Sequence, residues 1–272
     1  MVVFPKAKIN LGLRVTGRRP DGFHDIETIF YPVGLCDALE FVKADAGMQD
    51  DILTITGYDH GIRHEDNLVI KAARKLRETC RLPYLKIHLH KMIPSGAGLG
   101  GGSSDAACFL KTANRLFDLG LNKDELLKLA LSIGSDCPFF IDSLPALGTG
   151  RGEVLKPVEK ILGGLYIILA NPGINISTRE AYENCIPEKP GKSLSELIKN
   201  PVNEWKNLIK NDFENYVFTR HPSAALIKES FYREGALYSS LSGSGSTVYG
   251  LFPEKRDPPG DLKDFVIYSE VI

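Results

Sequence analysis

The glycine-rich segment Pro94–Ser104, with the sequence PSGAGLGGGSS, constrains the fold of this chain more than any other feature. Five glycines occupy seven positions, 96–102, between an alternating strand pattern at 84–90 and a helical pattern that begins at Ser103. Without side chains, backbone N–H groups can approach an anion closely. The helix start adds further N–H donors and the positive end of the helix dipole. The segment therefore predicts a loop that binds nucleotide phosphates.

Other interpretations of the segment are weaker. A Walker A loop requires Gly-Lys-Ser/Thr, and no lysine is present. The pattern G-x-G-x-x-G is met at Gly96, Gly98 and Gly101, but a dinucleotide fold would place a continuously apolar strand before it. A purely structural glycine loop stays open as the plain alternative. We expect Ser103 or Ser104 to cap the helix or to reach a phosphate oxygen, and Asp105 to act as an ordinary helix-start residue.

Composition limits the classes of partner. Of 272 residues, 43% are hydrophobic and 25% charged, which is typical of a globular protein. A net charge of −1 gives no general attraction to nucleic acid or to an anionic membrane, so we expect neither as a partner. The five cysteines are widely spaced and odd in number, which favours reduced thiols. No signal peptide or membrane span is visible, so we expect a cytoplasmic location.

The order of elements predicts an α+β fold with two domains, at 1–155 and 156–272. Glycine and proline gather at 143–164, where we expect the junction. Strands are predicted at 6–15, 26–33, 38–43, 51–56, 84–90, 165–170, 236–241, 247–252 and 265–272. Helices are predicted from Asp66 or Asn67 to about Arg77, from Ser103 to about Phe117, and at 124–133, 178–185, 193–199, 203–217 and 222–234.

Three polar residues are candidates for chemistry. Lys8 and Asn10 lie two apart on a predicted strand and so share one face; a solvated strand face is an equal alternative. Asp136 follows a helix end and precedes a short apolar segment, a place that can direct a carboxylate into a cleft. It also suits a helix N-cap with Pro138 in the first turn, and both roles are compatible.

Two further patterns carry weaker predictions. The loop LSGSGSTV at 241–248 is either a second backbone-rich wall of the site or a turn that joins two strands. His88 and His90 lie on one face of their strand and could offer two metal ligands, but no third ligand lies nearby in the sequence.

The segment PSGAGLGGGSSDAA resembles the phosphate loop of the GHMP kinases, and LSGSGSTV is similar to the third motif of that family. KAKINLGL near the N-terminus, DGFH at 21–24 and GSDCPFF at 134–140 resemble the members that phosphorylate the 2-hydroxyl of a cytidyl diphosphate of methylerythritol, in the non-mevalonate route to isoprenoids. The resemblance runs from residue 6 to about 252. It implies an N-terminal ribosomal-protein-S5-like domain, a ferredoxin-like C-terminal domain and ATP as co-substrate.

Roles carried over from the resemblance fall into three groups. Asp136 would be the catalytic base, and Lys8 its charged partner at the acceptor hydroxyl. The residues that would bind ATP are Pro94, Ser95, Gly96, Ala97, Gly98, Leu99, Gly100, Gly101, Gly102, Ser103, Ser104, Asn67 and Lys91. The residues that would bind the substrate are Asn10, Phe23, His24, Thr178, Tyr182, Gly243 and Ser244, with His24 bonded to the cytosine and with Phe23 and Tyr182 stacked on either side of it.

Some features depart from the family or stay open. Phe23 stands where the family often has tyrosine, and Arg151 matches no assigned position. The resemblance implies Mg²⁺, but no carboxylate can be assigned as its ligand, so the metal ligands are unknown. We expect a monomer or weak homodimer acting on a small molecule. The alternatives are a homoserine or mevalonate-type GHMP kinase, a dinucleotide-binding oxidoreductase, and a nucleotide sensor that does not catalyse a reaction.

Overall fold

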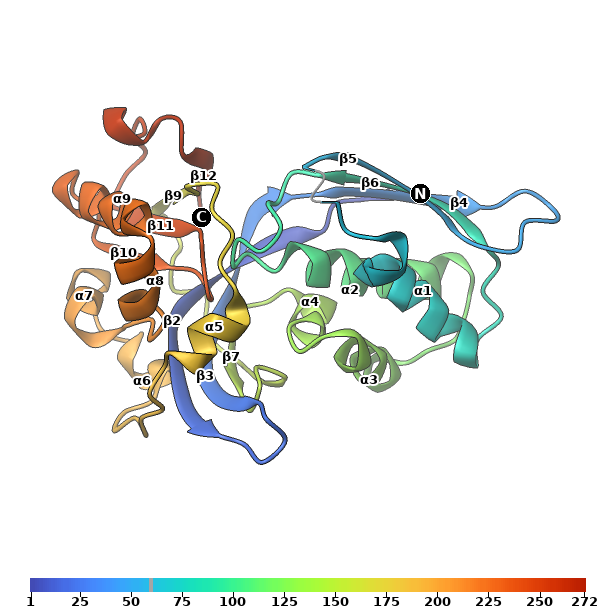
Figure 1. The fold of residues 1–272 in the computed structure, drawn as a ribbon, viewed down its shortest axis with the longest axis horizontal. Coiled ribbons are helices and arrows are strands. Elements are labelled where there is room, and N and C mark those ends of the chain that lie inside the picture. The colour runs from blue at the N-terminus through green and yellow to red at the C-terminus, as the bar shows by residue number, and fades with distance from the viewer. Residues whose placement is uncertain (59–60) are drawn as a thin grey trace. The chain divides into compact units, whose positions relative to one another are not determined.

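The computed structural model describes residues 1–58 and 61–272, and these form two compact units (Figure 1). Unit 1 comprises Met1–Ala7, Gly34–Ser95 and Gly100–Leu144; unit 2 comprises Lys8–Val33, Gly96–Leu99 and Pro145–Ile272. The chain therefore crosses between units several times. This differs from a linear division at residue 155, because Leu13, Val15 and Ile26 near the N-terminus pack in the core of the C-terminal half. The limits 1–155 and 156–272 stay a prediction.

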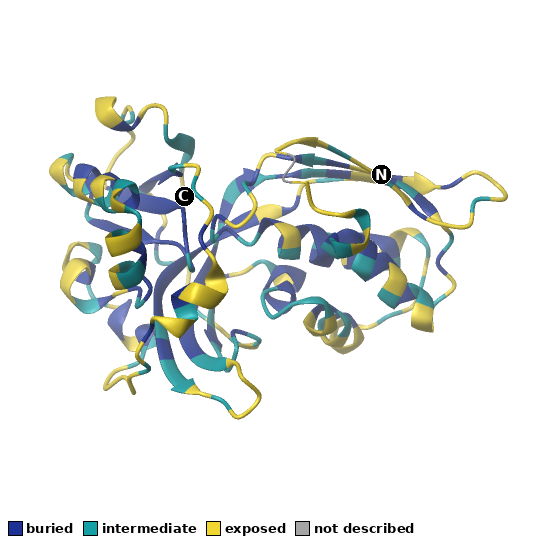
Figure 2. Ribbon diagram, viewed as in Figure 1, coloured by how far each residue is buried: buried dark blue, intermediate teal, exposed yellow. Residues whose placement is uncertain are grey.

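Unit 1 is built on a sheet with the order β1-β4-β6-β5. Strand β6 (Leu85–Lys91) is antiparallel to β4 (Ala38–Lys43) and parallel to β5 (Ile52–Gly57), and the short β1 (Val2–Val3) pairs with β4. Along β6 the apolar residues are buried and their neighbours are more exposed, which confirms the predicted alternation. Helices lie along one face of this sheet (Figure 1), and much of the helical ribbon nearest the sheet is coloured as buried in Figure 2.

The helices of unit 1 are η1 (His64–Asp66), α1 (Leu68–Thr79), α2 (Gly101–Leu116), α3 (Lys123–Ile133) and α4 (Cys137–Asp142). Asn67 caps α1, since its side chain accepts a hydrogen bond from the N–H of Val69 at 2.9 Å. The prediction that Ser103 or Ser104 caps α2 is wrong. Gly100, in the left-handed conformation, leads the chain directly into the helix, so both serines fall inside its first turns.

Unit 2 contains two sheets, ordered β2-β3-β7-β8 and β10-β11-β9-β12. Its strands are β2 (Lys6–Arg18, which begins in unit 1), β3 (His24–Cys36, which ends there), β7 (Ala146–Thr149), β8 (Val154–Pro157), β9 (Tyr166–Ala170), β10 (Tyr238–Leu241), β11 (Val248–Phe252) and β12 (Val266–Val271). Its helices are α5 (Thr178–Glu183), α6 (Leu194–Leu197), η2 (Val202–Glu204), α7 (Trp205–Leu208), α8 (Glu214–Arg220), α9 (Pro222–Arg233) and η3 (Gly260–Leu262).

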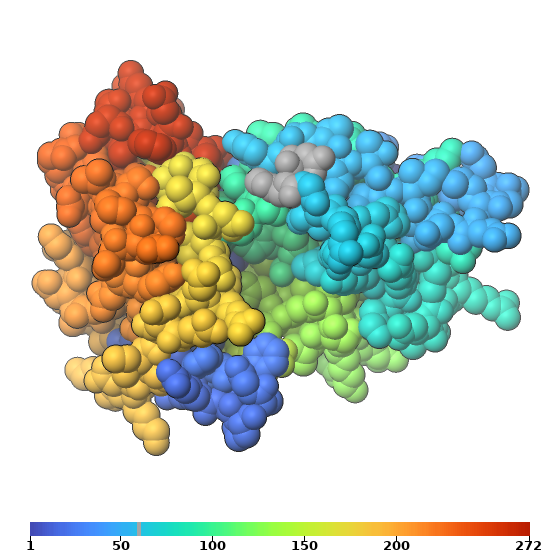
Figure 3. Space-filling model, in the orientation of Figure 1, coloured from blue at the N-terminus to red at the C-terminus, as the bar shows by residue number. Residues whose placement is uncertain are grey.

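The core of unit 2 joins its sheets and helices. Helix α9 packs on β10 and β11, and Phe213, Phe231 and Phe252 lie in one cluster with residues of β2, β3 and α5. In the space-filling view, α5 lies against the tip of the β2–β3 hairpin (Figure 3). Burial of these large side chains is the main stabilising term of the unit. The α+β, two-unit architecture expected from the sequence is confirmed.

The segment 143–164, expected to be a junction, includes the boundary between the two units at Leu144 and Pro145, and it also contains the β7–β8 hairpin. One prediction about unit 2 is wrong: the helix expected over 203–217 is broken between α7 and α8, where Ile209 is extended. Asn211 explains the break: its amide donates to the carbonyls of Leu241 and Gly243, both at 2.8 Å, and its oxygen accepts from the N–H of Phe213. These three hydrogen bonds of Asn211 stabilise the interrupted backbone more than a continuous helix would.

Candidate active site

The backbone of the glycine segment is preformed to bind an anion. The φ angles alternate in sign, because Gly96, Gly98 and Gly100 are left-handed (φ +65°, +76° and +70°) and the residues between them are not. Such alternation turns successive N–H groups to one side, as in known anion-binding nests. Among the residues that the structure describes, no N–H of residues 96–103 donates a hydrogen bond to a protein acceptor. Several of these residues are exposed or half-exposed, so their N–H groups are accessible to an anionic ligand.

The carbonyl groups of the same segment, in contrast, are held by the protein. The carbonyl of Ala97 accepts from the N–H of Thr247 at 3.1 Å, and that of Leu99 from the N–H of Lys8 at 3.0 Å. The carbonyl of Gly98 accepts from Lys8 Nζ at 2.8 Å and from Ser242 Oγ at 2.9 Å. A Cβ atom at Gly98 would lie 1.9 Å from the carbonyl oxygen of Ser242. The loop 241–248 therefore both joins β10 to β11 and packs on the glycine segment.

Lys8 and Asn10 form part of this packing, so the alternative of a solvated strand face is wrong. Both side chains are buried, at 3% and 1% exposure. Lys8 Nζ donates to Asn10 Oδ1 at 2.6 Å, which confirms that the two side chains share a face. The Asn10 amide donates to Thr28 Oγ1 at 2.9 Å, and the Asn10 carbonyl accepts from Tyr249. Lys8 is thereby a fixed cation, also within 5.5 Å of the Phe30 ring.

Asp136 lies at the start of α4, in unit 1, where α4 packs on α2. The residues around it reach the first turn of α2. A Cβ atom at Gly134 would lie 3.3 Å from Cys137 Sγ and 3.9 Å from Ser103 Oγ. Asp136 occupies the N-cap position with Pro138 in the first turn, as the sequence predicted, but its side chain makes no capping bond. Its carboxylate is thus not used to cap the helix.

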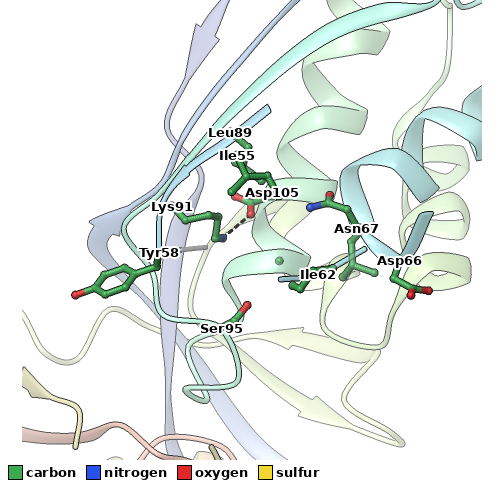
Figure 4. A pocket seen from close by; sticks show the side chains of 11 residues that line it. Ile55, Tyr58, Ile62, Asp66, Asn67, Leu89, Lys91, Ser95 and Asp105 are labelled. Atoms are coloured by element: carbon green, nitrogen blue, oxygen red, sulfur yellow. Dashed lines mark hydrogen bonds and ion pairs between the residues drawn. The ribbon is translucent and has the colours of Figure 1, made fainter. Parts of the chain in front are cut away.

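A pocket of about 200 Å³, partly open to solvent, lies beside the start of α2 in unit 1. It is lined by Ile55, Tyr58, Ile62, Asp66, Asn67, Leu68, Leu89, Lys91, Ser95, Gly102 and Asp105. Asn67 points toward Asp105 from the start of α1, Ser95 comes from the glycine segment, and Tyr58 points away (Figure 4). Apolar walls with a few polar groups are typical of a site for a nucleobase and ribose. Four of the expected ATP-binding residues thus line one pocket, namely Asn67, Lys91, Ser95 and Gly102.

A buried ionic cluster lies behind this pocket. Lys91 Nζ donates to Asp105 Oδ2 at 2.7 Å and to Asp37 Oδ2, and the three side chains are at most 8% exposed. Burial, opposed by the Lys91 charge, raises the pKa of Asp105 to about 7. Burial alone would lower the pKa of Lys91, but the carboxylates of Asp105 and Asp37 outweigh it and raise that pKa. The expectation that Asp105 is an ordinary helix-start residue is wrong, because its carboxylate faces inward.

Asp37 is the residue that the sequence analysis missed. It lies between β3 and β4 and is fully buried. The only local signal is an acidic residue between two strongly apolar strand patterns, and its partner Lys91 lies 54 positions away.

The residues expected to bind a cytosine lie together in unit 2. The rings of His24 and Tyr182 are stacked, 5.0 Å apart and inclined at 18°, and Tyr182 meets Phe213 edge-on at 4.8 Å. His24 Nε2 is buried and has no hydrogen-bond partner among the described residues. Phe23 is 52% exposed, and the Arg151 guanidinium lies 4.3 Å from its ring centre. Tyr182 therefore stacks on His24 here, while Phe23 pairs with the residue whose role the sequence left open.

The other expected substrate residues lie at the edge of the same unit. Thr178, the first residue of α5, is hydrogen-bonded through its hydroxyl to Ser244 at 2.9 Å. The carbonyl of Gly243 accepts from Asn211, and a Cβ atom at Gly243 would lie 3.3 Å from Asn10 Oδ1. Thr178, Ser244 and Gly243 are thus brought beside Asn10 by the loop 241–248.

Within residues 1–58 and 61–272, no group of three or more His, Cys, Asp or Glu residues is placed to hold a metal ion. His88 Nε2 and His90 Nδ1 both bond to Thr56 Oγ1 at 2.9 Å. The five cysteines form no disulfide. None of the described helices has the length and apolar character needed to cross a membrane.

Comparison with known proteins places these features in one family. Residues 67–143 match the GHMP kinases N terminal domain, and residues 193–264 match the GHMP kinases C terminal domain. The chain is 48% identical to the 4-diphosphocytidyl-2-C-methyl-D-erythritol kinase of Bacteroides thetaiotaomicron over 264 residues, which cover 97% of this chain and 95% of the relative.

Two solved structures, one more similar to this chain in sequence and one less, share its fold. A crystal structure of 4-(cytidine 5'-diphospho)-2C-methyl-D-erythritol kinase is 32% identical, with a TM-score of 0.76 over 92% of this chain and 90% of the other. The mevalonate kinase of Methanococcus jannaschii shares the fold alone, at 16% identity and a TM-score of 0.63 over 93% of this chain and 90% of the other. The chain belongs to the GHMP kinases and, within them, to the family of 4-diphosphocytidyl-2-C-methyl-D-erythritol kinases.

Proposed function

We propose that this protein transfers the terminal phosphoryl group of ATP to the 2-hydroxyl of 4-diphosphocytidyl-2-C-methyl-D-erythritol, in the non-mevalonate route to isoprenoid precursors. One observation supports the phosphate-binding part: the N–H groups at 96–103, at the start of the 16-residue helix α2, have no protein acceptor within residues 1–58 and 61–272. Helix starts and nests of this kind bind phosphate oxygens. The choice of acceptor is supported by the names of the full-length relatives.

The chain's own residues supply positioning and charge, which are the main requirements of phosphoryl transfer. The segment 94–104 binds the β- and γ-phosphates, and the pocket lined by Asn67 and Lys91 takes the adenosine part. Asp136 orients the acceptor hydroxyl and accepts its proton. Lys8, a buried ammonium held by Asn10 and Gly98, stabilises negative charge that develops on the acceptor oxygen.

The base and its sugar are bound by unit 2 in this proposal. His24 hydrogen-bonds to the cytosine, in keeping with its unpartnered Nε2, while Phe23 and Tyr182 stack on the ring. Asn10, Thr178, Gly243 and Ser244 contact the remainder of the substrate.

The proposal includes Mg²⁺, a cytoplasmic location, and a monomer or weak homodimer. Mg²⁺ binds through a few protein oxygens together with substrate phosphates and water, so it needs no cluster of carboxylates. In this proposal the ion would be held mainly by the phosphate oxygens of ATP and would neutralise their charge. The free thiols of the five cysteines suit a reducing compartment, which supports the cytoplasmic location in this proposal.

The test is an ATP-consumption assay with the cytidyl diphosphate substrate, followed by mass analysis of the product. We expect one ADP for each acceptor molecule that gains a phosphate. Faster turnover of homoserine or mevalonate would assign the chain to another GHMP activity. ATP binding without transfer to any acceptor would indicate a nucleotide sensor, and NADH binding without ATP binding would indicate an oxidoreductase.

A further inference from the structure

We propose that Asp37 is a positioning residue for the nucleotide: it fixes the point at which β6 enters the glycine segment and holds Lys91 at the wall of the ATP pocket. It touches no reacting atom. The inference rests on the proposed function, because it requires that the segment binds a nucleotide.

The first link joins Asp37 to the backbone before the glycine segment. Asp37 Oδ1 accepts hydrogen bonds from the N–H groups of Met92 and Ile93, at 2.6 and 2.8 Å. These residues immediately follow β6 and precede Pro94. Bonds from N–H groups to a carboxylate are stronger than those to a neutral acceptor. One carboxylate oxygen therefore fixes the entrance to the segment.

The second link runs through Lys91 to the exit of the segment. Asp37 Oδ2 binds Lys91 Nζ, which also donates to Asp105 Oδ2 at 2.7 Å on α2. A Cβ atom at Gly101 would lie 3.3 Å from Lys91 Nζ, so the ammonium lies directly against the first residue of the helix. The cluster thus ties both ends of the segment to one buried cation, and it does so beside the pocket of Figure 4.

The negative charge of Asp37 is needed to hold the Lys91 ammonium in its buried position. Loss of one carboxylate would leave Lys91 with Asp105 alone, and a buried charge that loses a partner is strongly destabilised or moves toward water. The water-accessible route for Lys91 is the pocket that it lines. Removal of the Asp37 charge should therefore alter the pocket, in addition to lowering stability.

Asp51 provides a matched control at the opposite end of the same strand. Its Oδ1 accepts from the N–H of Leu85, the first residue of β6, at 2.8 Å, and its carboxylate binds Arg77. It is also buried, at 5% exposure. It does not line the nucleotide pocket. Asp37 and Asp51 thus each accept backbone hydrogen bonds at one end of β6 and pair with a basic side chain, but only Asp37 lies next to the glycine segment.

The experiment compares Asp37→Asn with Asp51→Asn in the full chain. Calorimetry gives the ATP dissociation constant without acceptor, thermal melting gives Tm, and steady-state kinetics gives KM for each substrate. Asn keeps an oxygen for the backbone N–H groups and removes the charge. We expect both variants to melt earlier, and only Asp37→Asn to weaken ATP binding, by about tenfold for a lost charged hydrogen bond. Its KM for the acceptor should be unchanged.

A purely structural role predicts a different pattern. Equal effects of the two variants on ATP affinity, or wild-type affinity in Asp37→Asn despite a lower Tm, would overturn the inference. If Asp37→Asn does not fold, Asp105→Asn breaks the same cluster from the other side and is judged against Asp51→Asn in the same way. Wild-type protein that binds no ATP would reject the proposed function itself.

Discussion

The nucleotide side of unit 1 and the aromatic cluster of unit 2 are built by different means. The ends of the glycine segment are anchored by Asp37, Lys91 and Asp105, which are at most 7% exposed. The aromatic cluster of Phe23, His24 and Tyr182 is partly open, with Phe23 52% exposed. The glycine segment would hold its ligand mainly through main-chain groups whose ends are kept in place by buried charges, and the aromatic cluster would hold its ligand through individual side chains.

This difference has consequences for mutation. A backbone site is altered by substitutions that move the backbone, even where the replaced side chain never meets the ligand. A side-chain site is altered by the loss of the side chain itself. Substitutions in the two regions should therefore separate into effects on ATP and effects on the cytidyl substrate.

The largest expected effect is on the phosphoryl-transfer step itself, and it leaves ligand binding at the glycine segment and at the aromatic cluster unchanged. Asp136→Ala should lower kcat by about 10²–10⁴-fold, because general-base assistance is lost, while ATP binds as in the wild type. Steady-state kinetics and calorimetry give the two quantities. Asp142→Ala, at the other end of α4, is the control. Turnover near the wild-type rate would remove Asp136 from the role of base.

The next effect tests the backbone site. Gly98→Ala should raise the KM for ATP by about tenfold or more, because its Cβ atom would overlap the carbonyl of Ser242 in addition to the cost of about 1–2 kcal/mol for a left-handed alanine. Gly120→Ala, with φ +73° and open space around it, isolates the conformational cost alone. If both variants bind ATP equally well, the contact between the two loops is not needed to shape the site.

Loss of a ring tests the side-chain site. Tyr182→Ala should raise the KM for the cytidyl substrate by about 5–150-fold, since stacking of a base on an aromatic ring contributes about 1–3 kcal/mol. The KM for ATP should not change. Tyr216→Ala is a matched control on α8, because Tyr216 bonds to Glu180 of the same helix α5. Equal changes in both KM values would contradict the separation of the two regions.

The smallest effect concerns the pH dependence of stability. The pKa of Asp105 is raised to about 7 in the folded state, mainly by burial, from its ordinary value of 3.8. Between these values the folded chain holds a proton that the unfolded chain has lost. The stability that this group contributes is thus present below about pH 4 and lost as the pH rises through about 7.

Asp105→Asn removes this titration. The Tm of the wild type, relative to that of Asp105→Asn, should fall by a few degrees between about pH 5 and pH 8. Melting curves in a series of buffers measure it. A constant difference across that range would show that Asp105 stays ionised.

The sequence predicted those parts of the fold that depend on local pattern. The alternation of β6, the cap at Asn67, and the pairing of Lys8 with Asn10 all follow from neighbouring residues. The glycine segment was likewise recognisable, because φ > 0 at several close positions requires glycine.

Features that depend on distant residues could not be predicted in this way. The inward turn of Asp105 requires Lys91 and Asp37, and the break after α7 requires the loop 241–248 that Asn211 bonds. The β7–β8 hairpin was hidden because its glycines also suit a linker; Gly148 instead makes room for Phe30, where a Cβ atom would lie 2.5 Å from the ring. Such partners become visible only in the folded chain.

Phosphate binding by the glycine segment is tested most directly by NMR of the backbone amides of residues 96–103 while a non-hydrolysable ATP analogue is added to uniformly ¹⁵N-labelled protein. These amide resonances should shift further than those of the loop 117–122, which contains the left-handed Gly120 and lies outside the glycine segment. Saturable binding of the analogue with resonances of 96–103 unchanged would contradict the claim that this backbone binds the phosphates.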